Sequence, residues 1–324
     1  MNSRDRFLET MRFGKPDRVP YFQEGIRPDV LTAWGRQGLR SADELSSLFP
    51  IDGRQEEEID GYPHPRFLRW PRSVGGLNGF RRRLKPGDNR LPSGWRKKVP
   101  AWRNRQDTLM LEVHQGFFLT MGVNDWKQFN WVIESLIDRP ELILEFMRIK
   151  VEMVEVLMER FLSEVQIDAA IFSEPIGGNN GALISPRMYE KFVLSSYTPL
   201  LGVLKRHGVD NIILRTYANA RVLIPSMLKY GINCLWACET NAEAMDYRSL
   251  RKEFGKELCL IGGIDLDVLR EGKEAIRREV ELKVPPLLEQ GGYVPLADGR
   301  VREDIPFENY VYYRELLEKV TRRG

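Results

Sequence analysis

From about residue 165 onward, short strand-like runs alternate with longer segments of helical periodicity. The runs are aliphatic along their whole length, as expected for a parallel sheet whose two faces are both covered. A strand, a helix and another strand imply parallel pairing, because the helix returns the chain to the same end of the sheet. The predicted strands are 169–174, 211–216, 232–238, 258–265 and 291–298, and the predicted helices are 186–207, 222–230, 247–254 and 268–290, the last kinked or interrupted by Pro285 and Pro286.

Each predicted strand ends in polar residues, among them Glu174, Arg215, Tyr217, Glu239 and Asp298. A (β/α)8 barrel gathers the carboxyl ends of all its strands around one mouth, whereas an open doubly wound sheet would not collect so many. We therefore expect an α/β fold of the TIM-barrel type, with residues 1–324 forming a single domain.

The first half of the chain has a weaker pattern. We expect an amphipathic helix over 4–12, a first strand over 17–22 that opens onto Glu24, and a long helix over 140–164 capped by Asp138. The residues between, 52–131, are rich in Gly, Pro, Arg and Trp, which predicts an irregular cationic insertion with one or two β-hairpins near the barrel mouth.

Within that insertion, residues 66–105 concentrate arginine and lysine and contain Asp88 as their one acid. One interpretation is a cationic lid for an anionic substrate or an acidic partner. The other is a solvated hairpin whose cations face water. Trp70, Trp95 and Trp102 lie between the cations, as stacking platforms for nucleic acid do, but no nucleic-acid fold surrounds them, and we expect no nucleic-acid partner.

Composition narrows the setting of the chain. A net charge of +3 over 324 residues argues for neither nucleic acid nor membrane. The charged N-terminus predicts no signal peptide, and no segment approaches the ~20 apolar residues of a membrane span, so we expect a cytoplasmic protein. Cys234, Cys238 and Cys259 lie in apolar runs, which predicts buried, inert thiols.

Several segments together resemble the uroporphyrinogen decarboxylase superfamily. The resemblance covers the first twenty residues and nearly all of 165–315, and it implies a (β/α)8 barrel with its site in the mouth. It rests on RFLETMRFGKPDRVPYF at the start, NNGALISPRMYEKFV (179–193), HGVDNIILRTYANARVLIPSMLKYGINCLW (207–236), LIGGIDLDVLREGKEAIRREVELKVPPLLEQGGYVP (260–295) and DIPFENYVYY (304–313).

The superfamily contains metal-free porphyrinogen decarboxylases and zinc-dependent methyltransferases that work with a corrinoid protein. The resemblance implies an arginine-rich motif in the decarboxylases, of which this chain retains Arg27 alone. It implies a His-x-Cys zinc pair in the methyltransferases, where this chain has Arg215 and Tyr217. Arginine has no free lone pair and tyrosine is a poor ligand at neutral pH, so we expect no zinc there. An unorthodox site from Cys238, Glu174 and Asp298 stays open.

Without a metal, other groups have to stabilise developing charge. We expect the catalytic residues to be Glu174, Arg215, Tyr217 and Asp298: Arg215 as an anion holder, Tyr217 as a proton donor, and Glu174 as a general acid or base. The alternative is that Glu174 or Asp298 only forms a salt bridge with Arg215. The residues expected to bind substrate are Glu24, Arg27, Asn180, Cys238 and Glu239.

Three functions remain open. The favoured one is transfer of a methyl group from a small methoxylated or methylated compound to a corrinoid on a partner protein, with no permanently bound cofactor. The second is metal-independent decarboxylation of an acidic substrate such as uroporphyrinogen. The third is a noncatalytic barrel that binds a corrinoid or tetrapyrrole. A homodimer is compatible with each.

Overall fold

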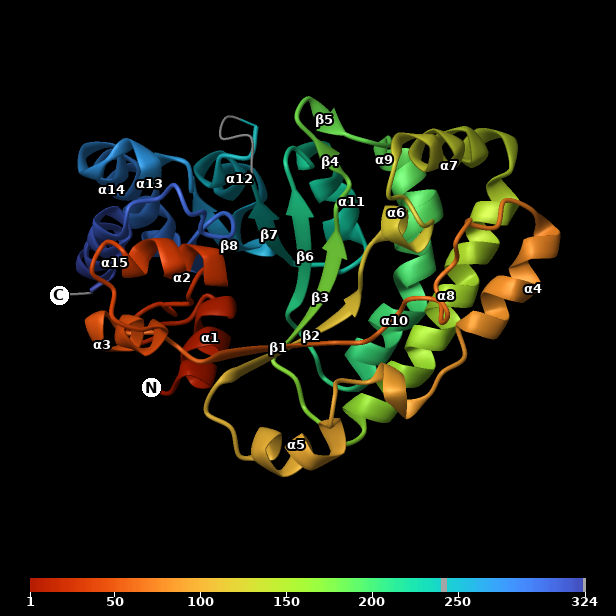
Figure 1. Ribbon diagram of the computed structural model, residues 1–324, viewed down its shortest axis with the longest axis horizontal. Coiled ribbons are helices and arrows are strands. Elements are labelled where there is room, and N and C mark those ends of the chain that lie inside the picture. The colour runs from red at the N-terminus through yellow and green to blue at the C-terminus, as the bar shows by residue number, and fades with distance from the viewer. Residues whose placement is uncertain (240–243, 323–324) are drawn as a thin grey trace. The chain divides into compact units, whose positions relative to one another are not determined.

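The structure is a computed structural model that describes residues 1–239 and 244–322 (Figure 1). Its chain forms two compact units that are interleaved in sequence, and each is described by itself. The N/C unit consists of residues 1–54, 106–108 and 234–324, and the central unit consists of residues 55–105 and 109–233. Both are α/β, which confirms the predicted fold class at that level; the closed eight-stranded barrel and the single domain remain predictions.

The central unit is built on a sheet with the strand order β1-β2-β3-β6. In it, β3 lies between β2 and β6 and is parallel to both. The strands are β1 (Arg54–Glu58), β2 (Thr108–His114), β3 (Ala169–Glu174) and β6 (Ile212–Tyr217). The prediction for 169–174 is confirmed to the residue. Its first four residues are apolar, as expected for a strand covered on both faces.

Helices α8 (Pro140–Leu162) and α10 (Ser195–Arg206) lie side by side in the central unit (Figure 1). The predicted helix 186–207 is continuous through α9 (Pro186–Met188) and a π-helical turn over Tyr189–Leu194 into α10. The remaining helices of the unit are α4 (Val74–Arg83), α5 (Trp95–Arg103), α6 (Phe117–Thr120), α7 (Trp126–Asp138) and α11 (Ile224–Lys229).

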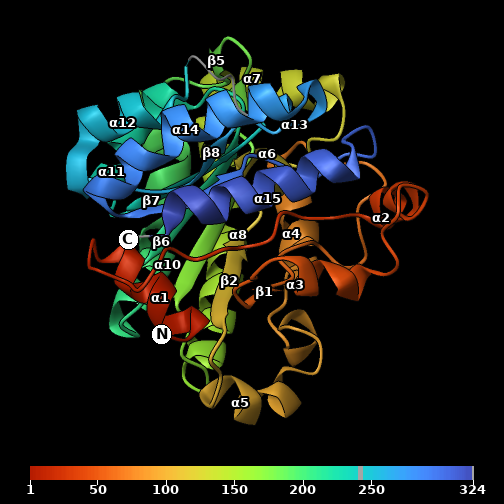
Figure 2. The same ribbon diagram turned by 90° about the vertical axis from the view of Figure 1, so that its left-hand side faces the viewer.

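The N/C unit has three parallel strands, β7 (Cys234–Cys238), β8 (Cys259–Ile264) and β9 (Tyr293–Ala297), in the order β7-β8-β9. Its two longest helices, α14 (Lys273–Gln290) and α15 (Phe307–Thr321), lie side by side (Figure 2). The other helices are α1 (Ser3–Met11), α2 (Pro28–Gly35), α3 (Leu45–Leu48), α12 (Tyr247–Phe254) and α13 (Val268–Glu271).

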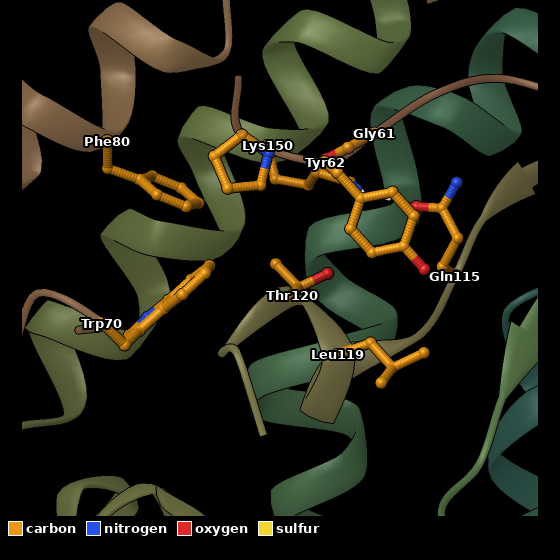
Figure 3. A pocket seen from close by; sticks show the side chains of 9 residues that line it. Gly61, Tyr62, Trp70, Phe80, Gln115, Leu119, Thr120 and Lys150 are labelled. Atoms are coloured by element: carbon orange, nitrogen blue, oxygen red, sulfur yellow. Dashed lines mark hydrogen bonds between the residues drawn. The ribbon is translucent and has the colours of Figure 1, made fainter. Parts of the chain in front are cut away.

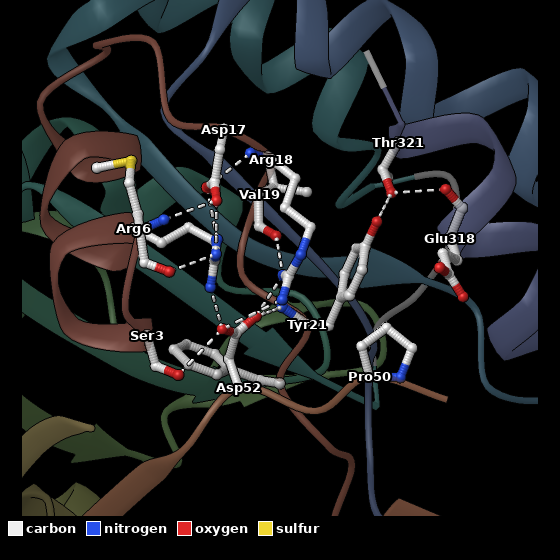
Figure 4. Close-up of polar contacts among 12 residues, drawn as sticks. Ser3, Arg6, Asp17, Arg18, Val19, Tyr21, Pro50, Asp52, Glu318 and Thr321 are labelled. Atoms are coloured by element: carbon white, nitrogen blue, oxygen red, sulfur yellow. Dashed lines mark hydrogen bonds and ion pairs between the residues drawn. The ribbon is translucent and has the colours of Figure 1, made fainter. Parts of the chain in front are cut away.

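A network of buried charges ties the beginning of the N/C unit together (Figure 4). Asp52 accepts hydrogen bonds from Arg6 and Arg18, each at 2.5 Å, and Arg6 also holds Asp17. Asp52 is 3% exposed, so both guanidinium groups are needed to compensate its burial. Arg6, Asp17, Arg18 and Asp52 bind one another in this network, so we assign them a structural role.

Four sequence predictions are wrong. Residues 17–22 form an irregular segment, not a strand. Residues 52–131 are not an irregular insertion, because they supply β1, β2 and several helices of the central unit. The segment 268–290 breaks at Gly272, where φ is +116°, and α14 continues through Pro285 and Pro286. Finally, Asp138 ends α7, and the residue at the cap of α8 is Arg139.

In the described part of the chain, no helix combines the length and the apolar character needed to cross a membrane.

Candidate functional site

The sheet of the central unit has a charged face and a helix face, which follow from side-chain alternation along the strands. Arg215 is aligned with Ser173, and Glu174 is aligned with Thr216. Aligned residues of neighbouring strands point to the same face, whereas successive residues of one strand point to opposite faces. Arg215 therefore lies on one face, the charged face, and Glu174 lies on the other, the helix face.

The charged face carries a cluster of Arg215, Glu56 and Glu112. The Arg215 guanidinium is 2.5 Å from a Glu56 carboxylate oxygen and 3.4 Å from a Glu112 oxygen. The side chains of Arg215 and Glu112 are 15% and 18% exposed, so the cluster is half-buried. Burial raises the pKa of Glu112 to about 7, although Arg215 opposes this shift, and Glu58 and Glu56 add to it. At neutral pH, Glu112 is therefore protonated in about half of the molecules and ionised in the others.

A buried chain of hydrogen bonds lies next to this cluster (Figure 3). The Lys150 ammonium group, on α8, donates to the Gly61 carbonyl oxygen at 2.5 Å and to the Gln115 side-chain oxygen at 2.9 Å. The Gln115 amide nitrogen donates in turn to Glu58 at 3.0 Å. Burial lowers the pKa of Lys150 to about 7. The central unit thus holds a carboxyl group and an amine that both titrate near neutral pH.

The helix face encloses Glu174 completely. One carboxylate oxygen accepts a hydrogen bond from the Tyr197 hydroxyl of α10 at 2.6 Å, and the other accepts one from the Phe117 backbone N–H at 2.8 Å. Gly116 makes this turn with φ +97°, and a Cβ there would lie 2.6 Å from the Ser173 carbonyl oxygen. Burial raises the pKa of Glu174 to about 7. Substrate has no route to this carboxyl group in the structure.

His114 belongs to the same enclosed cluster. Its Nδ1 accepts the Gly116 backbone N–H at 2.9 Å and lies 3.1 Å from the Tyr197 hydroxyl. A nitrogen that accepts a backbone N–H carries no proton, so the ring proton is on Nε2. Burial lowers the pKa of His114 well below its usual value. The ring is therefore neutral and part of the core.

Two further predicted residues lie in the central unit. Tyr217 ends β6 on the same face as Arg215 and is half-buried. Asn180 is exposed in the turn of an antiparallel hairpin between β4 (Gly177–Gly178) and β5 (Gly181–Ala182). The predicted gathering of Glu174 with Arg215 and Tyr217 in one cavity is corrected, because Glu174 lies on the helix face.

The other predicted residues belong to the N/C unit, and their convergence with Arg215 stays a prediction. Asp298 is 4% exposed, and its carboxylate accepts the Leu266 backbone N–H at 3.1 Å. Cys238 ends β7 and is half-buried. The exposed Glu239 has φ +48°, and its backbone N–H donates to the Asp298 carbonyl oxygen at 2.6 Å.

Glu24 and Arg27, both predicted to bind substrate, differ in their surroundings. Glu24 is buried and accepts hydrogen bonds from the Tyr310 and Tyr313 hydroxyls, both at 2.8 Å, and from Arg314 at 3.3 Å. One of its oxygens also accepts the Ala297 backbone N–H at 3.1 Å, so both oxygens are occupied by contacts with α15 and β9. Arg27 is half-exposed and pairs with Asp29 at 3.0 Å. Neither arrangement favours a role in gripping a substrate carboxylate.

Glu56, Glu112 and Lys150 were not among the residues predicted from the sequence. The signal for Glu112 was a single acid within the apolar run TLMLEVH, which was assigned to the insertion and not to a strand. The signal for Lys150 was its position in α8, three residues after Met147 and three before Met153, which places a cation on the buried face of the helix. A lone charge in an otherwise buried pattern is a marker of function or of a specific partner.

The residues at the expected zinc positions do not fit a zinc ion. Arg215 is bound to two carboxyl groups and offers no lone pair. In the unorthodox alternative, Glu174 would be a ligand, but both of its oxygens already accept hydrogen bonds on the helix face. Among the described residues, no three His, Cys, Asp or Glu side chains are grouped in a way that could hold a metal ion.

Part of the cationic segment 66–105 forms ion pairs inside the central unit. Trp95 and Trp102 are buried against the Phe161 ring and cannot serve as stacking platforms. The ion pairs include Arg81 with Glu145 and Glu152, Arg90 with Asp60, Arg96 with Asp88, Lys98 with Glu57, Arg103 with Glu164, and Arg105 with Asp168. The segment packs as helices α4 and α5, so it is neither the expected lid nor a hairpin. Most of its cations are nevertheless exposed to solvent, as the second interpretation predicts.

Comparisons with known proteins give two similar relatives. The uroporphyrinogen decarboxylase of Legionella pneumophila strain Paris is 26% identical over 164 residues, which are 50% of this chain and 44% of the relative. The protein of the same name from strain Corby is 25% identical over 159 residues, which are 48% of this chain and 43% of the relative. The matches therefore span less than half of each relative.

Among solved structures, xylanase B from Clostridium stercorarium F9 is 11% identical and has a TM-score of 0.43, covering 85% of this chain and 89% of that one. A similarity of this degree does not establish a shared fold or function. The family model described as uroporphyrinogen decarboxylase (URO-D) matches residues 120–296, more than half of the 324 residues. The matched region contains β3, β6, β7 and β8 and most of β9. The chain belongs to the uroporphyrinogen decarboxylase family.

Proposed function

We propose that this member of the family transfers a methyl group from a small methoxylated or methylated compound to a corrinoid on a partner protein. Glu112 supplies the proton that the leaving oxygen needs. The observation that carries the proposal is the cluster on the charged face, in which a carboxyl group with a pKa of about 7 lies beside an arginine already neutralised by Glu56.

The charge balance of this cluster favours a neutral or cationic substrate over a polycarboxylate. A decarboxylase for an acidic substrate needs cations that are free to hold carboxylates. Arg215 is paired with Glu56 and lies near Glu112, and Arg27 is paired with Asp29. In the segment 66–105, the arginines that pair with acids of the central unit include Arg81, Arg96 and Arg105. With Glu112 protonated, Glu56 balances the charge of Arg215, so this cluster offers no net positive charge to a further carboxylate.

The proposed step uses Glu112 as a general acid. As the bond between oxygen and the methyl carbon breaks, negative charge builds up on the oxygen of the departing alcohol or phenol. A protonated Glu112 donates its proton to that oxygen, and the methyl group passes to the acceptor. Arg215 then stabilises the carboxylate that Glu112 becomes, at 3.4 Å. General-acid catalysis of this kind contributes about 10²- to 10⁴-fold in rate.

A direct test supplies the purified protein with cob(I)alamin, as the acceptor in place of the partner, and with a panel of aryl methyl ethers and methylated amines. Methylation of the corrinoid is followed by its absorption spectrum. We expect methylation with at least one donor, and its loss in Glu112→Gln. Absence of methylation with every donor, together with loss of carboxyl groups from added uroporphyrinogen, would overturn the proposal.

Decarboxylation is the second candidate, because both Legionella relatives bear that name. It requires no metal, and Glu112 would protonate the carbon from which carbon dioxide departs. Incubation with uroporphyrinogen, followed by chromatography of the oxidised porphyrins, decides between the two. If neither reaction occurs and the protein binds a tetrapyrrole tightly, the third function, a noncatalytic binding barrel, is supported instead.

A further inference from the structure

Helix α7 of the central unit exposes large apolar side chains to solvent (Figure 1). On its outer side, Trp126 is 79% exposed and Ile137 is 69% exposed. Burial of such side chains is favourable, so two of them on one surface helix indicate a contact that the single chain leaves open. The helix also contacts α8, and the residues that it buries are Gln128, Val132, Ser135 and Leu136.

Trp126 and Ile137 are the two ends of a regular stripe. At 3.6 residues per turn, Trp126, Asn130, Ile133 and Ile137 lie within about 60° of one another and extend along ~16 Å of helix. The spacing of four, three and four residues is that of the a and d positions of a coiled coil. Ile133 is half-buried, Asn130 is exposed, and the Trp126 indole lies 5.6 Å from the Phe129 ring. The stripe, called the seam below, thus has the pattern that packs against a second helix.

Two charges of opposite sign flank the seam on one side. Lys127 and Glu134 are exposed, and each directly follows a residue of the seam. Among the described residues, neither of them has an ion-pair partner. They are seven positions apart, or ~10 Å along the helix, which is too far for them to pair with each other. Both charges are therefore available to a partner helix.

We propose that α7 is the contact surface of a homodimer, in which the two copies of α7 lie antiparallel across a two-fold axis at the middle of the helix. Trp126 then packs against the partner's Ile137 at each end of the seam. The same symmetry places Lys127 beside the partner's Glu134, and it does so twice, because a two-fold axis repeats every contact.

Charge complementarity selects this arrangement. Antiparallel helices pair the residues that follow the d positions with one another, which brings Lys127 to an acid, whereas a parallel pair leaves Lys127 with no acid opposite it. The antiparallel order also places opposite ends of the two helix dipoles side by side. Asn130 lies next to the axis, and a polar residue in such a seam fixes the register of the two helices. A second copy of this chain thus supplies each group that the seam requires.

The size of the seam predicts a weak dimer. A standard interface buries about 800 Å² on each partner, and one helix of 13 residues supplies on the order of half of this area. We therefore expect a dissociation constant on the order of 10 µM.

The first experiment is sedimentation equilibrium of the full-length protein, at concentrations from about a tenth of that constant to about twentyfold above it. We expect a reversible equilibrium of monomer and dimer. Trp126→Ala should weaken the dimer at least about thirtyfold, because a large aromatic side chain leaves the interface twice. The exposed indole contributes little to the fold, so the circular dichroism spectrum should not change. Leu282→Ala, a change at a 56% exposed leucine of α14, is the matched control and should leave the dimer intact.

A charge exchange tests the orientation of the two helices. Lys127→Glu places an acid opposite the partner's Glu134 and should weaken the dimer about tenfold, as should Glu134→Lys. The double variant Lys127→Glu/Glu134→Lys restores both ion pairs in the opposite order and should dimerise within about threefold of the natural protein. A protein that is monomeric at every concentration, a dimer that Trp126→Ala leaves intact, or a double variant as weak as the single ones overturns the proposal.

Discussion

The two faces of the central sheet carry carboxyl groups with nearly the same pKa in very different surroundings. Burial raises the pKa of Glu112 and of Glu174 to about 7. Glu112 is 18% exposed beside Arg215, whereas Glu174 is sealed by Tyr197 and the Phe117 backbone. A raised pKa therefore does not by itself identify an acid that meets substrate, because a group held in the core for structural reasons has the same shift.

The largest expected difference between the faces is in activity. Glu112→Gln should lower the rate of methyl transfer about 10²- to 10³-fold, because an amide cannot donate the proton. Glu174→Gln, the matched change on the helix face, should retain activity within a few-fold. Single-turnover methylation of cob(I)alamin measures both. An equal loss in the two variants would mean that the faces do not differ in function.

Stability should show the reverse order. Glu174→Ala removes the acceptor of the Tyr197 hydroxyl and of the Phe117 N–H and leaves a cavity, which should cost about 3 kcal/mol in the free energy of unfolding. Glu112→Ala, at a half-buried position, should cost about 1 kcal/mol or less. Urea unfolding followed by circular dichroism compares the two. A Glu112→Ala variant less stable than Glu174→Ala would contradict the structural role of Glu174.

The pH dependence of stability tests the raised pKa of Glu174. The folded chain keeps the Glu174 proton up to about pH 7, whereas the unfolded chain releases it near the usual value of 4.5. Stability due to this group is therefore full below pH 4.5 and falls as pH rises to about 7. Glu174→Gln should flatten that fall. Melting temperatures of both proteins from pH 4.5 to 8 give the difference, and parallel curves would contradict the assignment.

Activity offers a finer test of the charged face. If Glu112 has to be protonated, the rate of methyl transfer should decline as pH rises through about 7. Because Arg215 opposes the upward shift of the Glu112 pKa, Arg215→Met should move this decline to higher pH. The pH profile of the single-turnover rate measures the shift. A decline that moves to lower pH would exclude Glu112 as the titrating group.

The smallest expected effect concerns metal binding. Arg215 and Tyr217 are two residues apart on one strand and face the same way. Arg215→His/Tyr217→Cys should bring two zinc ligands to the charged face and raise the zinc content of the purified protein above that of the natural chain. Elemental analysis of both proteins measures it. A double variant with no more zinc would show that further ligands have been lost as well.

The sequence predicted the second half of the fold well and the first half poorly. Runs such as AAIFSE begin with four consecutive apolar residues, which favour a buried strand, and the strand boundaries there agree within about two residues. The strand β2 escaped notice because Glu112 and His114 interrupt its apolar pattern within a region dense in arginine. The cations obscured the pattern because their carboxylate partners lie far away in the sequence, as Glu145 does from Arg81.

The candidate site was harder to predict than the fold. Arg215 was found because it ends an apolar run, but its partner Glu56 lies 159 residues away. Glu174 was predicted to face the substrate because it ends a strand. However, successive residues at a strand end point to opposite faces of the sheet. Side-chain alternation separates Arg215 from Glu174 once the register of β3 against β6 is known, and the register depends on long-range pairing that no local pattern contains.

The contacts of Glu24 with α15 have a consequence for how the chain reaches its native state. Glu24 binds Tyr310 and Arg314, which follow it by 286 and 290 residues. During synthesis on the ribosome, Glu24 must therefore stay solvated until about 290 further residues have emerged. Contacts of such separation slow folding, so chaperones should engage the nascent N-terminal segment for longer than the segments of the central sheet.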